Sequence, residues 1–551
     1  MRRHLRTRRE YLLADLLAGA TNALSYVPQG MAYAVVAGVS PTCGLYTGVF
    51  APLIGALVAG SSFMVITVTN ELAMPTGEIL ASTSSVRALF TLTLLIGLIQ
   101  LSFGLLKLGG VTRFISHCVT TGFVAGVGVL LILGQLQKLT GYKGTVHGNV
   151  FVKTWDWLTH LNGIDWRTTV VGITTVVIIV ALQRTRLKPM ALVGGLVLAT
   201  ALVSLLRWNS VDLVGGISRI PRGLPFPVLP DWRLAPQLFV PALSLAVLGL
   251  SIAAGVSQNY PESDGSMPDS SRDFLGQGLA NICGGFFQGM PAGGSISRTA
   301  TSVSAGARTR WANIFAGLVL GLFLLSVGSV AELVPMAALA GLLVYIGFNV
   351  LHLERITRVW NTHTAERAAM VATFLLTLFI PLHWAIFAGV AITLLLYIYS
   401  SSTKVRLVQI VPDNSGGFEE RTAPDRLASG QVTALHAYGN AFFAAVYVLE
   451  ASLPRPEEAR NAVVLFGLRG RESLTSSGIA MLERYLRRLR TGGNELMLVG
   501  VEPGMRRELE RTGMMSVLGE NNVFESTSSV GGSFRAAWAA AHELVKRKNS
   551  V

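Results

Sequence analysis

Long apolar stretches follow one another from Tyr11 to about Ser400, separated by short polar connections. Breaking the chain at charged, Pro-rich or Trp-rich stretches gives roughly fourteen apolar segments. Most of them are long enough to cross a hydrocarbon core of ~30 Å as a helix. A soluble core of this length would need far more polar surface. The pattern therefore predicts an α-helical protein that crosses a membrane many times.

The segments divide into two halves of about seven each, residues 11–207 and 236–402, and an odd number per half gives the halves opposite orientations. The third segment of each half is the weakest. Residues 61–80 contain Asn, Glu, Pro and Gly, and residues 290–308 are rich in Gly, Ser and Thr. Interrupted segments at matching positions of two halves indicate a transporter's binding site. A helix that begins in mid-membrane presents unpaired N–H groups and a positive dipole end, so two facing starts predict an anion site.

The pattern changes after residue 403, where strand and helix patterns alternate as in a soluble protein. Residues 404–551 are therefore predicted to form a small α/β domain behind a membrane domain of residues 1–403. Residues 412–430 are expected to be a linker or loop-rich lead-in. The predicted strands are 431–438, 462–468 and 495–501, and the predicted helices are 442–453, 478–489, 505–512 and 534–545.

Composition and charge agree with a membrane protein. The chain of 551 residues is 51% hydrophobic and 14% charged, against about 25% charged in a typical soluble domain. Its net charge of +14 falls largely in short connections, as the positive-inside rule requires on the cytoplasmic side, so nucleic-acid binding is not indicated. An even number of spans places both termini on the same side of the membrane, and the basic clusters predict that this side is the cytoplasm, with the protein in the cell membrane. The basic clusters include Arg2, Arg3, Arg6, Arg8 and Arg9, then Arg184, Arg186 and Lys188, Arg308 and Arg310, Arg355, Arg358 and Arg367, and Lys404 and Arg406.

Two interruptions of the apolar pattern are candidate binding residues. Arg298 places a full charge in an apolar span, which by default indicates function, and Ser295, Ser297 and Thr299 add hydroxyl donors beside it. The alternative is an arginine that reaches the membrane edge with its long side chain. In the first span, Pro28 frees a backbone carbonyl and Gln29 offers a donor and an acceptor. A simple packing kink is the alternative there.

Glu71 follows the expected helix start at Thr69 and Asn70. An ionised carboxylate would repel an anion, so Glu71 should be protonated or paired with a cation. This motivates the hypothesis that Glu71 couples proton or sodium movement to transport, and an acid at the membrane interface is the alternative. The sequence contains no GxxxxGK[ST] phosphate-binding loop, and its cysteines and histidines show no metal-ligand spacing, so we expect no enzyme activity, cofactor or metal site.

A set of short motifs is distributed along the apolar part of the chain. The motifs are Asp15-Leu16, Ala18-Gly19, Pro28-Gln29-Gly30-Met31-Ala32-Tyr33, Pro41, Gly44-Leu45-Tyr46, Gly122-Phe123, Gln135-Leu136, Gln277-Gly278-Leu279-Ala280-Asn281, Ser295-Ile296-Ser297-Arg298-Thr299 and Ala305-Gly306-Ala307-Arg308-Thr309. In these residues the chain resembles the SulP-type anion permeases, the sulfate permease family that includes the prestin and pendrin branch, and the resemblance covers nearly its whole length. Its tail resembles the STAS domain (sulfate transporter and anti-sigma factor antagonist) of that family.

This resemblance implies two inverted seven-span repeats with two half-length spans, split into core and gate domains and often assembled as a homodimer. It also implies an anion site between the starts of spans three and ten and beside span one. The site residues that it implies are Gln29, Tyr33, Thr69, Asn70, Ser297 and Arg298.

Three departures from the family pattern concern coupling and regulation. The eighth span carries no acid in Gly249-Leu250-Ser251-Ile252-Ala253, and the third span begins Thr67-Val68-Thr69-Asn70-Glu71 rather than with a Gly-Pro turn. In the tail, Thr475-Ser476-Ser477-Gly478 replaces an Asp-Ser-Ser-Gly motif. Ser476 is therefore a candidate phosphorylated residue, and the alternative is that Ser476 or Ser477 merely caps the following helix.

The leading interpretation is a secondary transporter that carries a sulfate-like oxyanion, bicarbonate or a dicarboxylate such as fumarate by alternating access. A nucleobase permease of the same inverted-repeat fold is one alternative, although such sites tend to use paired acids. A membrane sensor that acts through its tail is another, and a channel-like leak is a third.

Overall fold

The computed structural model describes residues 9–83, 85–110, 116–144, 149–185, 187–216, 220, 223–262, 264–403, 405–413, 417–439, 443–471, 473–529 and 531–550. Of the predicted basic clusters, Arg2, Arg3, Arg6, Arg8, Arg186 and Lys404 lie outside these residues. The chain divides into two compact units between Thr393 and Leu394.

The first unit is helical. Among its described residues, each predicted apolar segment corresponds to one helix, and the short helices α6 and α14 are additional. In the part of the chain that the structure describes, seven helices are long and apolar enough to cross a membrane by length and composition. In chain order the helices are α1 (Arg9–Val36), α2 (Pro41–Val58), α3 (Asn70–Ala81), α4 (Val86–Leu105), α5 (His117–Thr140), α6 (Val150–Thr159), α7 (Trp166–Gln183), α8 (Ala191–Leu205), α9 (Ala235–Asn259), α10 (Ser270–Phe286), α11 (Ile296–Ser304), α12 (Trp311–Val327), α13 (Met336–Val350), α14 (Leu353–Trp360), α15 (Thr364–Phe379) and α16 (Leu382–Thr403).

The third segment of each half is short, as predicted. Helix α3 has 12 residues and α11 has 9. A three-residue strand precedes each, β1 (Val65–Thr67) and β2 (Gly293–Ser295), and the two strands pair antiparallel with Ile66 opposite Gly294. This pairing satisfies backbone groups that could not face lipid unpaired. It also brings the starts of the two half-length helices together.

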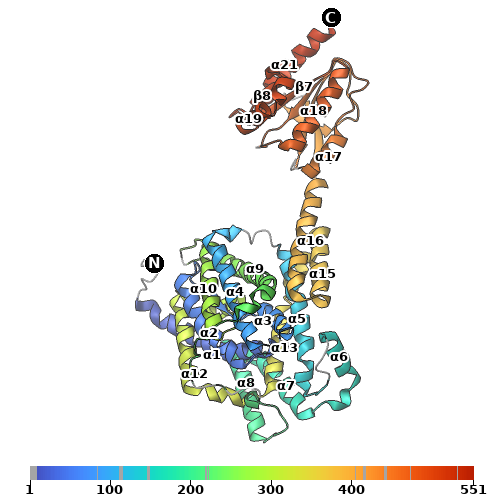
Figure 1. The fold of residues 1–551 in the computed structure, drawn as a ribbon. Helices are drawn as coiled ribbons and strands as arrows, with labels where there is room; N and C mark the ends of the chain where they lie inside the picture. Colours follow the sequence, from blue (N-terminus) through green and yellow to red (C-terminus); the bar gives the residue numbers. More distant parts are fainter. Residues whose placement is uncertain are drawn as a thin grey trace. The chain divides into compact units, whose positions relative to one another are not determined.

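The helices of the first unit pack in two groups, which correspond to the core and gate domains that the resemblance implies. The core group contains α1–α4 and α9–α12, and the gate group contains α5, α7, α8, α13, α15 and α16. Within the core, α4 and α10 lie side by side and cross at Gly97 and Gly278 (Figure 1). A Cβ atom at Gly97 would lie 2.6 Å from the backbone nitrogen of Ile282. Only glycine permits this close approach.

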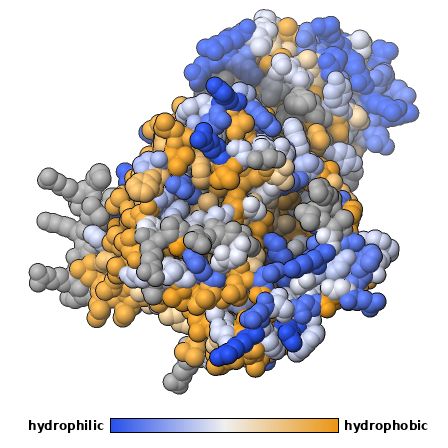
Figure 2. Space-filling model, turned by 60° about the horizontal axis from the view of Figure 1, so that its bottom comes forward, coloured by the Kyte–Doolittle hydropathy of each residue, from blue (hydrophilic) through white to orange (hydrophobic). Residues whose placement is uncertain are grey.

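Large apolar side chains cover much of the outside of the first unit, and Figure 2 shows them gathered over its surface. Ile173 and Val177 on α7 and Leu318 and Leu322 on α12 are each at least half exposed. Such a surface is unfavourable in water and suits lipid contact. The first unit is therefore a multi-pass membrane domain.

The second unit is built on one sheet of six strands in the order β4-β3-β5-β6-β7-β8. Its central pairs β5–β6 and β6–β7 are parallel. Alternate residues of β6 face opposite layers, so that Val464 and Phe466 pack with α18 while Val463 and Leu465 pack with α21. The elements are β3 (Arg406–Pro412), β4 (Phe418–Thr422), β5 (Val432–Tyr438), α17 (Phe443–Ser452), β6 (Val463–Gly467), α18 (Thr475–Thr491), β7 (Glu495–Val501), α19 (Pro503–Arg511), α20 (Met514–Leu518), β8 (Val523–Glu525) and α21 (Gly532–Asn549).

The sequence prediction for this unit was incomplete, because β3 and β8 were not predicted as strands and two further details differ in the structure. Residues 412–430 are not only a linker, because they contain β4, which pairs antiparallel with β3 at the sheet edge. All five residues of β4 are exposed, so they carry no alternating apolar signal. Helix α18 begins at Thr475, and its N-cap residue is Leu474, whose N–H donates to the Glu508 carboxylate at 3.0 Å. Ser476 therefore lies in the first turn, exposed, and does not cap the helix.

Candidate functional site

The junction of β1, β2 and the two helix starts forms a buried polar site. Helix α3 begins at Asn70 with no side-chain cap, whereas Ser295 caps α11 by accepting a hydrogen bond from the Arg298 N–H at 3.3 Å. Both helices point their positive dipole ends toward the strand pair. This arrangement favours negative charge between them.

Arg298 lies in the first turn of α11 with its side chain buried against α1. Its guanidinium donates to the Ser25 hydroxyl and to the Ser25 carbonyl, each at 2.7 Å, and also to the Gln29 side-chain oxygen. The guanidinium carbon lies 5.5 Å from the centre of the Tyr26 ring, within the range of a cation–π contact. The charge is thus held in place by neutral acceptors and an aromatic face.

A polar stripe on α1 supplies these partners. Asn22, Ser25, Gln29 and Tyr33 are spaced by three or four residues, so they share one face of the helix. The Gln29 amide nitrogen donates to the Tyr33 hydroxyl at 2.7 Å. The structure therefore brings Gln29, Tyr33 and Arg298 together in one hydrogen-bonded chain.

Three neighbouring side chains on β1 and at the start of α3 have polar atoms without a hydrogen-bond partner in the described part of the chain. They are the hydroxyls of Thr67 and Thr69 and both polar atoms of the Asn70 amide, and all three residues are buried. Leaving such a group unsatisfied costs about 1–3 kcal/mol, so buried polar groups normally have a partner. Their clustering at the helix start is typical of a position that a polar ligand or water occupies.

Ser297 and Glu71 lie differently from the other predicted site residues. Ser297 is exposed on α11, with its hydroxyl 3.4 Å from that of Ser295, and it is not part of the buried cluster. Glu71 is in the first turn of α3 and is half-buried. The six predicted binding residues thus separate into five buried ones and one exposed one.

The sequence interpretation missed a second polar layer on α4 and α10, beside the site. The Asn281 amide donates to the Gln100 side-chain oxygen at 2.8 Å, and both residues are fully buried. Gln277 is also fully buried, and neither polar atom of its amide has a partner among the described residues. A Cβ atom on Gly249 would lie 3.7 Å from the Gln277 oxygen, so these amides sit beside the eighth span, where the expected acid is missing. The available sequence signal was the polar spacing of Gln277 and Asn281 on one helix face.

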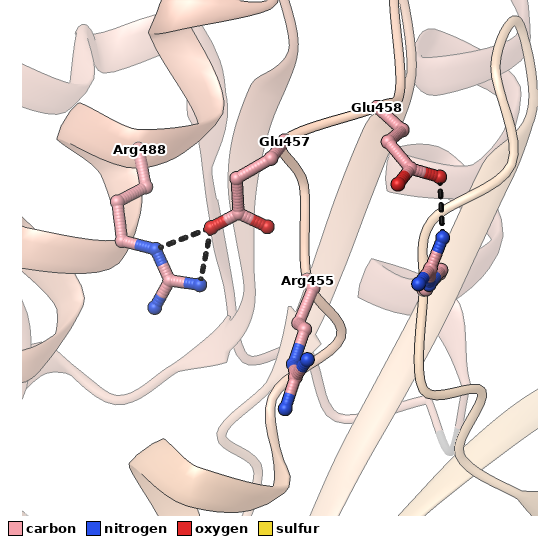
Figure 3. Close-up of a pocket in the computed structure, with 5 residues that line it drawn as sticks. Arg455, Glu457, Glu458 and Arg488 are labelled. Carbon is pink, nitrogen blue, oxygen red and sulfur yellow. Dashed lines mark hydrogen bonds and ion pairs between the residues drawn. The ribbon is translucent and has the colours of Figure 1, made fainter.

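A charged pocket of about 420 Å³ lies in the second unit. Figure 3 shows Glu457 facing Arg488, with Glu458 on the other side of the pocket. The Glu457 carboxylate accepts from Arg488 at 2.8 Å for the shorter contact, and the Glu458 carboxylate accepts from Arg426 at 2.6 Å. Arg455 lies between these pairs. All four paired side chains are more than a third exposed, and exposed ion pairs of this kind contribute little to stability. Because its charges are mostly neutralised in pairs, this pocket is a weaker anion site than the helix-start junction.

Comparisons with known proteins agree with this geometry. The sulfate permease family matches residues 12–373, and the STAS domain matches residues 423–530. The chain is 27% identical over 537 residues to YvdB of Bacillus subtilis (strain 168), covering 94% of this chain and 97% of that one. It is 24% identical over 536 residues to the bicarbonate transporter BicA of Synechocystis, covering 94% and 93%.

A solved structure of SLC26A9 superposes with a TM-score of 0.84 at 19% identity, covering 97% of this chain and 91% of that one. At this identity the superposition shows the fold alone. Together with the family match over residues 12–373, it places the half-length helices and the α/β tail in a known architecture. The chain belongs to the sulfate permease family, a family of anion transporters, and carries a C-terminal STAS domain.

Proposed function

We propose that this protein is a secondary transporter of a small anion, and that the anion binds between the starts of α3 and α11 beside α1. The observation that carries the proposal is the cluster of unpartnered hydroxyl and amide groups at Thr67, Thr69 and Asn70, next to the buried charge of Arg298. The amide and hydroxyl groups can donate hydrogen bonds to anion oxygens, and the two dipole ends add favourable potential. The substrate class is a sulfate-like oxyanion, bicarbonate or a dicarboxylate such as fumarate.

The transport cycle that we propose is alternating access, in which the core group carries the site past the gate group. The N-terminus and the STAS domain lie in the cytoplasm of the cell, the membrane domain lies in the cell membrane, and two chains associate as a homodimer. The distribution of basic residues supports this orientation. Chemical crosslinking in membranes tests the dimer, and protease access to the STAS domain in inside-out vesicles tests the orientation.

Uptake of radiolabelled anions into proteoliposomes tests the substrate and the site. The panel is sulfate, bicarbonate, chloride, fumarate and succinate, for wild type, Arg298→Ala and the matched control Arg308→Ala, which removes an exposed arginine outside the site. A charge about 5 Å from an anion contributes roughly 3 kcal/mol at an effective dielectric of 20, so Arg298→Ala should reduce uptake by about 100-fold or more. Equal uptake in the two variants would refute the site.

Coupling is tested on Glu71. If Glu71 carries the coupled proton, an inward proton gradient stimulates uptake in wild type and not in Glu71→Gln, which keeps anion binding. Sodium coupling predicts a response to a sodium gradient instead. An unchanged proton response in Glu71→Gln would remove Glu71 from the mechanism.

A nucleobase permease remains the second candidate because it shares the inverted-repeat fold. The arginine and neutral donors at this site favour an anion over a nucleobase, which is more often held by paired acids. Adding uracil and adenine to the uptake panel separates the two. Absence of uptake of every compound by folded protein would favour a membrane sensor that acts through the STAS domain.

A further inference from the structure

Glu78 on α3 contacts the gate group at the opposite end of that helix from the anion site. Its carboxylate accepts a hydrogen bond from the Leu382 N–H at 2.8 Å. Leu382 is the first residue of α16, and α3 belongs to the core group. This bond therefore joins the half-length helix that begins at the site to a helix of the gate.

The chemistry of the α16 start explains why an outside carboxylate is useful there. The first N–H groups of a helix have no partner within the helix and are normally satisfied by a Ser, Thr, Asp or Asn at the N-cap. Here the preceding residue is Pro381, whose side chain offers no oxygen. Glu78 supplies the missing acceptor from another helix, with a charge that suits the positive dipole end.

Other contacts hold the same segment to the core. The Ser244 hydroxyl on α9 donates to the His383 carbonyl at 2.8 Å. One apolar cluster continues from Ile79 on α3 and Leu238 on α9 to Leu382 on α16. Core and gate are therefore in close contact at this end.

A pocket of about 310 Å³ opens beside the Glu78 contact. Its lining comes from both groups of helices and includes Glu78 and Ser82 from α3, Leu238 from α9 and His383 from α16. His383 is the titratable group that shares this pocket with Glu78. The start of α16 thus has open space on one side and the core on the other.

We propose that Glu78 is a positioning residue that holds the gate helix α16 against the core and keeps the outer side of the transporter closed. This proposal rests on the proposed transport function, and it adds a named contact that must break when the core moves. Counting spans from a cytoplasmic N-terminus places the Glu78 end of α3 on the outer side. Because α3 is a single helix of 12 residues, its end at the anion site and its end that carries Glu78 move together.

Removing the Glu78 contact should make the outer side of the transporter open more often. Loss of an N-cap contact destabilises a helix start by an amount equivalent to about a 2- to 30-fold shift in an equilibrium. Glu78→Ala should therefore raise the population of the outward-open form by a factor in this range. Glu78→Gln should raise it less, because a neutral amide oxygen can still accept the bond but more weakly.

Labelling of a buried reporter cysteine tests this expectation without any substrate. Leu238→Cys places a thiol at a fully buried position that lines the pocket. A membrane-impermeant maleimide is added outside intact cells, and the labelling rate is compared for the reporter alone and with Glu78→Ala or Glu78→Gln. The unmodified chain measures the background from its native cysteines. Ser82→Ala is the matched control, since the Ser82 hydroxyl donates to the Ile79 carbonyl within the same helix end.

Faster labelling with Glu78→Ala, a smaller increase with Glu78→Gln and no change with Ser82→Ala would support the proposal. An unchanged rate in folded Glu78→Ala, or an equal increase with Ser82→Ala, would overturn it. If Glu78→Ala does not fold, the Glu78→Gln rate decides in the same two directions. Because labelling needs no substrate, failure of uptake by wild type would refute the transport function separately.

Discussion

Helices α1 and α2 cross so closely at Gly44 that this position offers a sharp test of the packing around the site. An ideal Cβ atom on Gly44 would lie 2.0 Å from the carbonyl oxygen of Gly30, the residue after Gln29. Ordinary contact begins at 3.4 Å, so Gly44→Ala would force the two backbones apart by about 1.4 Å, the difference between these values. The Tyr26 hydroxyl also donates to the Gly44 carbonyl at 2.9 Å, and the displacement would strain that bond.

The expected loss of stability follows from the steric clash with Gly30 and the strained Tyr26 hydrogen bond. Overpacking a filled core costs typically about 1–3 kcal/mol, and weakening a buried hydrogen bond adds about 0.5–1.5 kcal/mol. Gly44→Ala should therefore lose about 2–4 kcal/mol of stability, since the clash is with backbone and cannot relax by a rotamer change. The displaced α1 also carries Gln29, so anion uptake should fall with stability.

Thermal unfolding in detergent measures the effect. Because membrane proteins often unfold irreversibly, variants are compared at one heating rate, and Gly44→Ala should lower the apparent melting temperature by about 2–5 °C. Gly134→Ala is the matched control, because a Cβ atom there meets nothing within 4 Å, and alanine favours a helix over glycine by about 0.5–1 kcal/mol. Unchanged stability of Gly44→Ala, or an equal loss in Gly134→Ala, would refute the reasoning.

Three further predictions test other buried or titrating groups. Asp15 is fully buried, and its carboxylate accepts hydrogen bonds from two backbone N–H groups and a hydroxyl in the loop before α12. Asp15→Asn should lower the free energy of unfolding by about 1.5–3 kcal/mol. An unchanged melting temperature would contradict this. Gln277→Leu should raise the melting temperature, because it removes a buried amide that has no hydrogen-bond partner among the described residues. A lower melting temperature would instead mean that a bound polar group satisfies the amide. Burial, together with the nearby Arg471, lowers the pKa of His436 in β5. The unfolded chain then binds a proton more readily, so stability of the second unit should be full above about pH 6.5 and fall as the pH drops toward the lowered folded pKa. The protection of the β5 amides from hydrogen exchange, corrected for intrinsic rates, should decrease between pH 7.5 and 5.5. The decrease should be smaller in His436→Gln than in wild type, and an identical decrease would argue against His436.

The helical segments of the first unit could be predicted because they depend on local patterns. Each apolar segment that was long enough to span became a helix, and the two interrupted segments became half-length helices behind short strands. In the second unit, β3, β4 and β8 were missed. All five residues of β4 are exposed, and β3 and β8 have few fully buried residues, so none of them carries a strong apolar signal. Local signals therefore identified the strongly buried segments and did not identify strands with few buried residues.

The candidate site was predicted only in part, for a related reason. Arg298, Gln29 and Asn70 stood out as polar residues in apolar segments, which is a local signal. The partner of Arg298 was not predictable in this way, since Ser25 lies 273 residues away along the chain. The amide pair of Gln100 and Asn281 likewise joins helices from the two halves, and only the packing of α4 against α10 brings it together.

The way in which Arg298 is held bears on how an anion could be bound and still released. A bare guanidinium facing an anion in a low-dielectric site would bind it strongly, whereas a transport site must release what it binds. Arg298 already donates to neutral acceptors on α1, so an anion at the helix starts would feel its field without taking all of its hydrogen bonds. The unpartnered groups of Thr69 and Asn70 would then make the direct contacts. In the proposed site the charge would select for anions as a class, and the neutral donors around it would discriminate between them by shape.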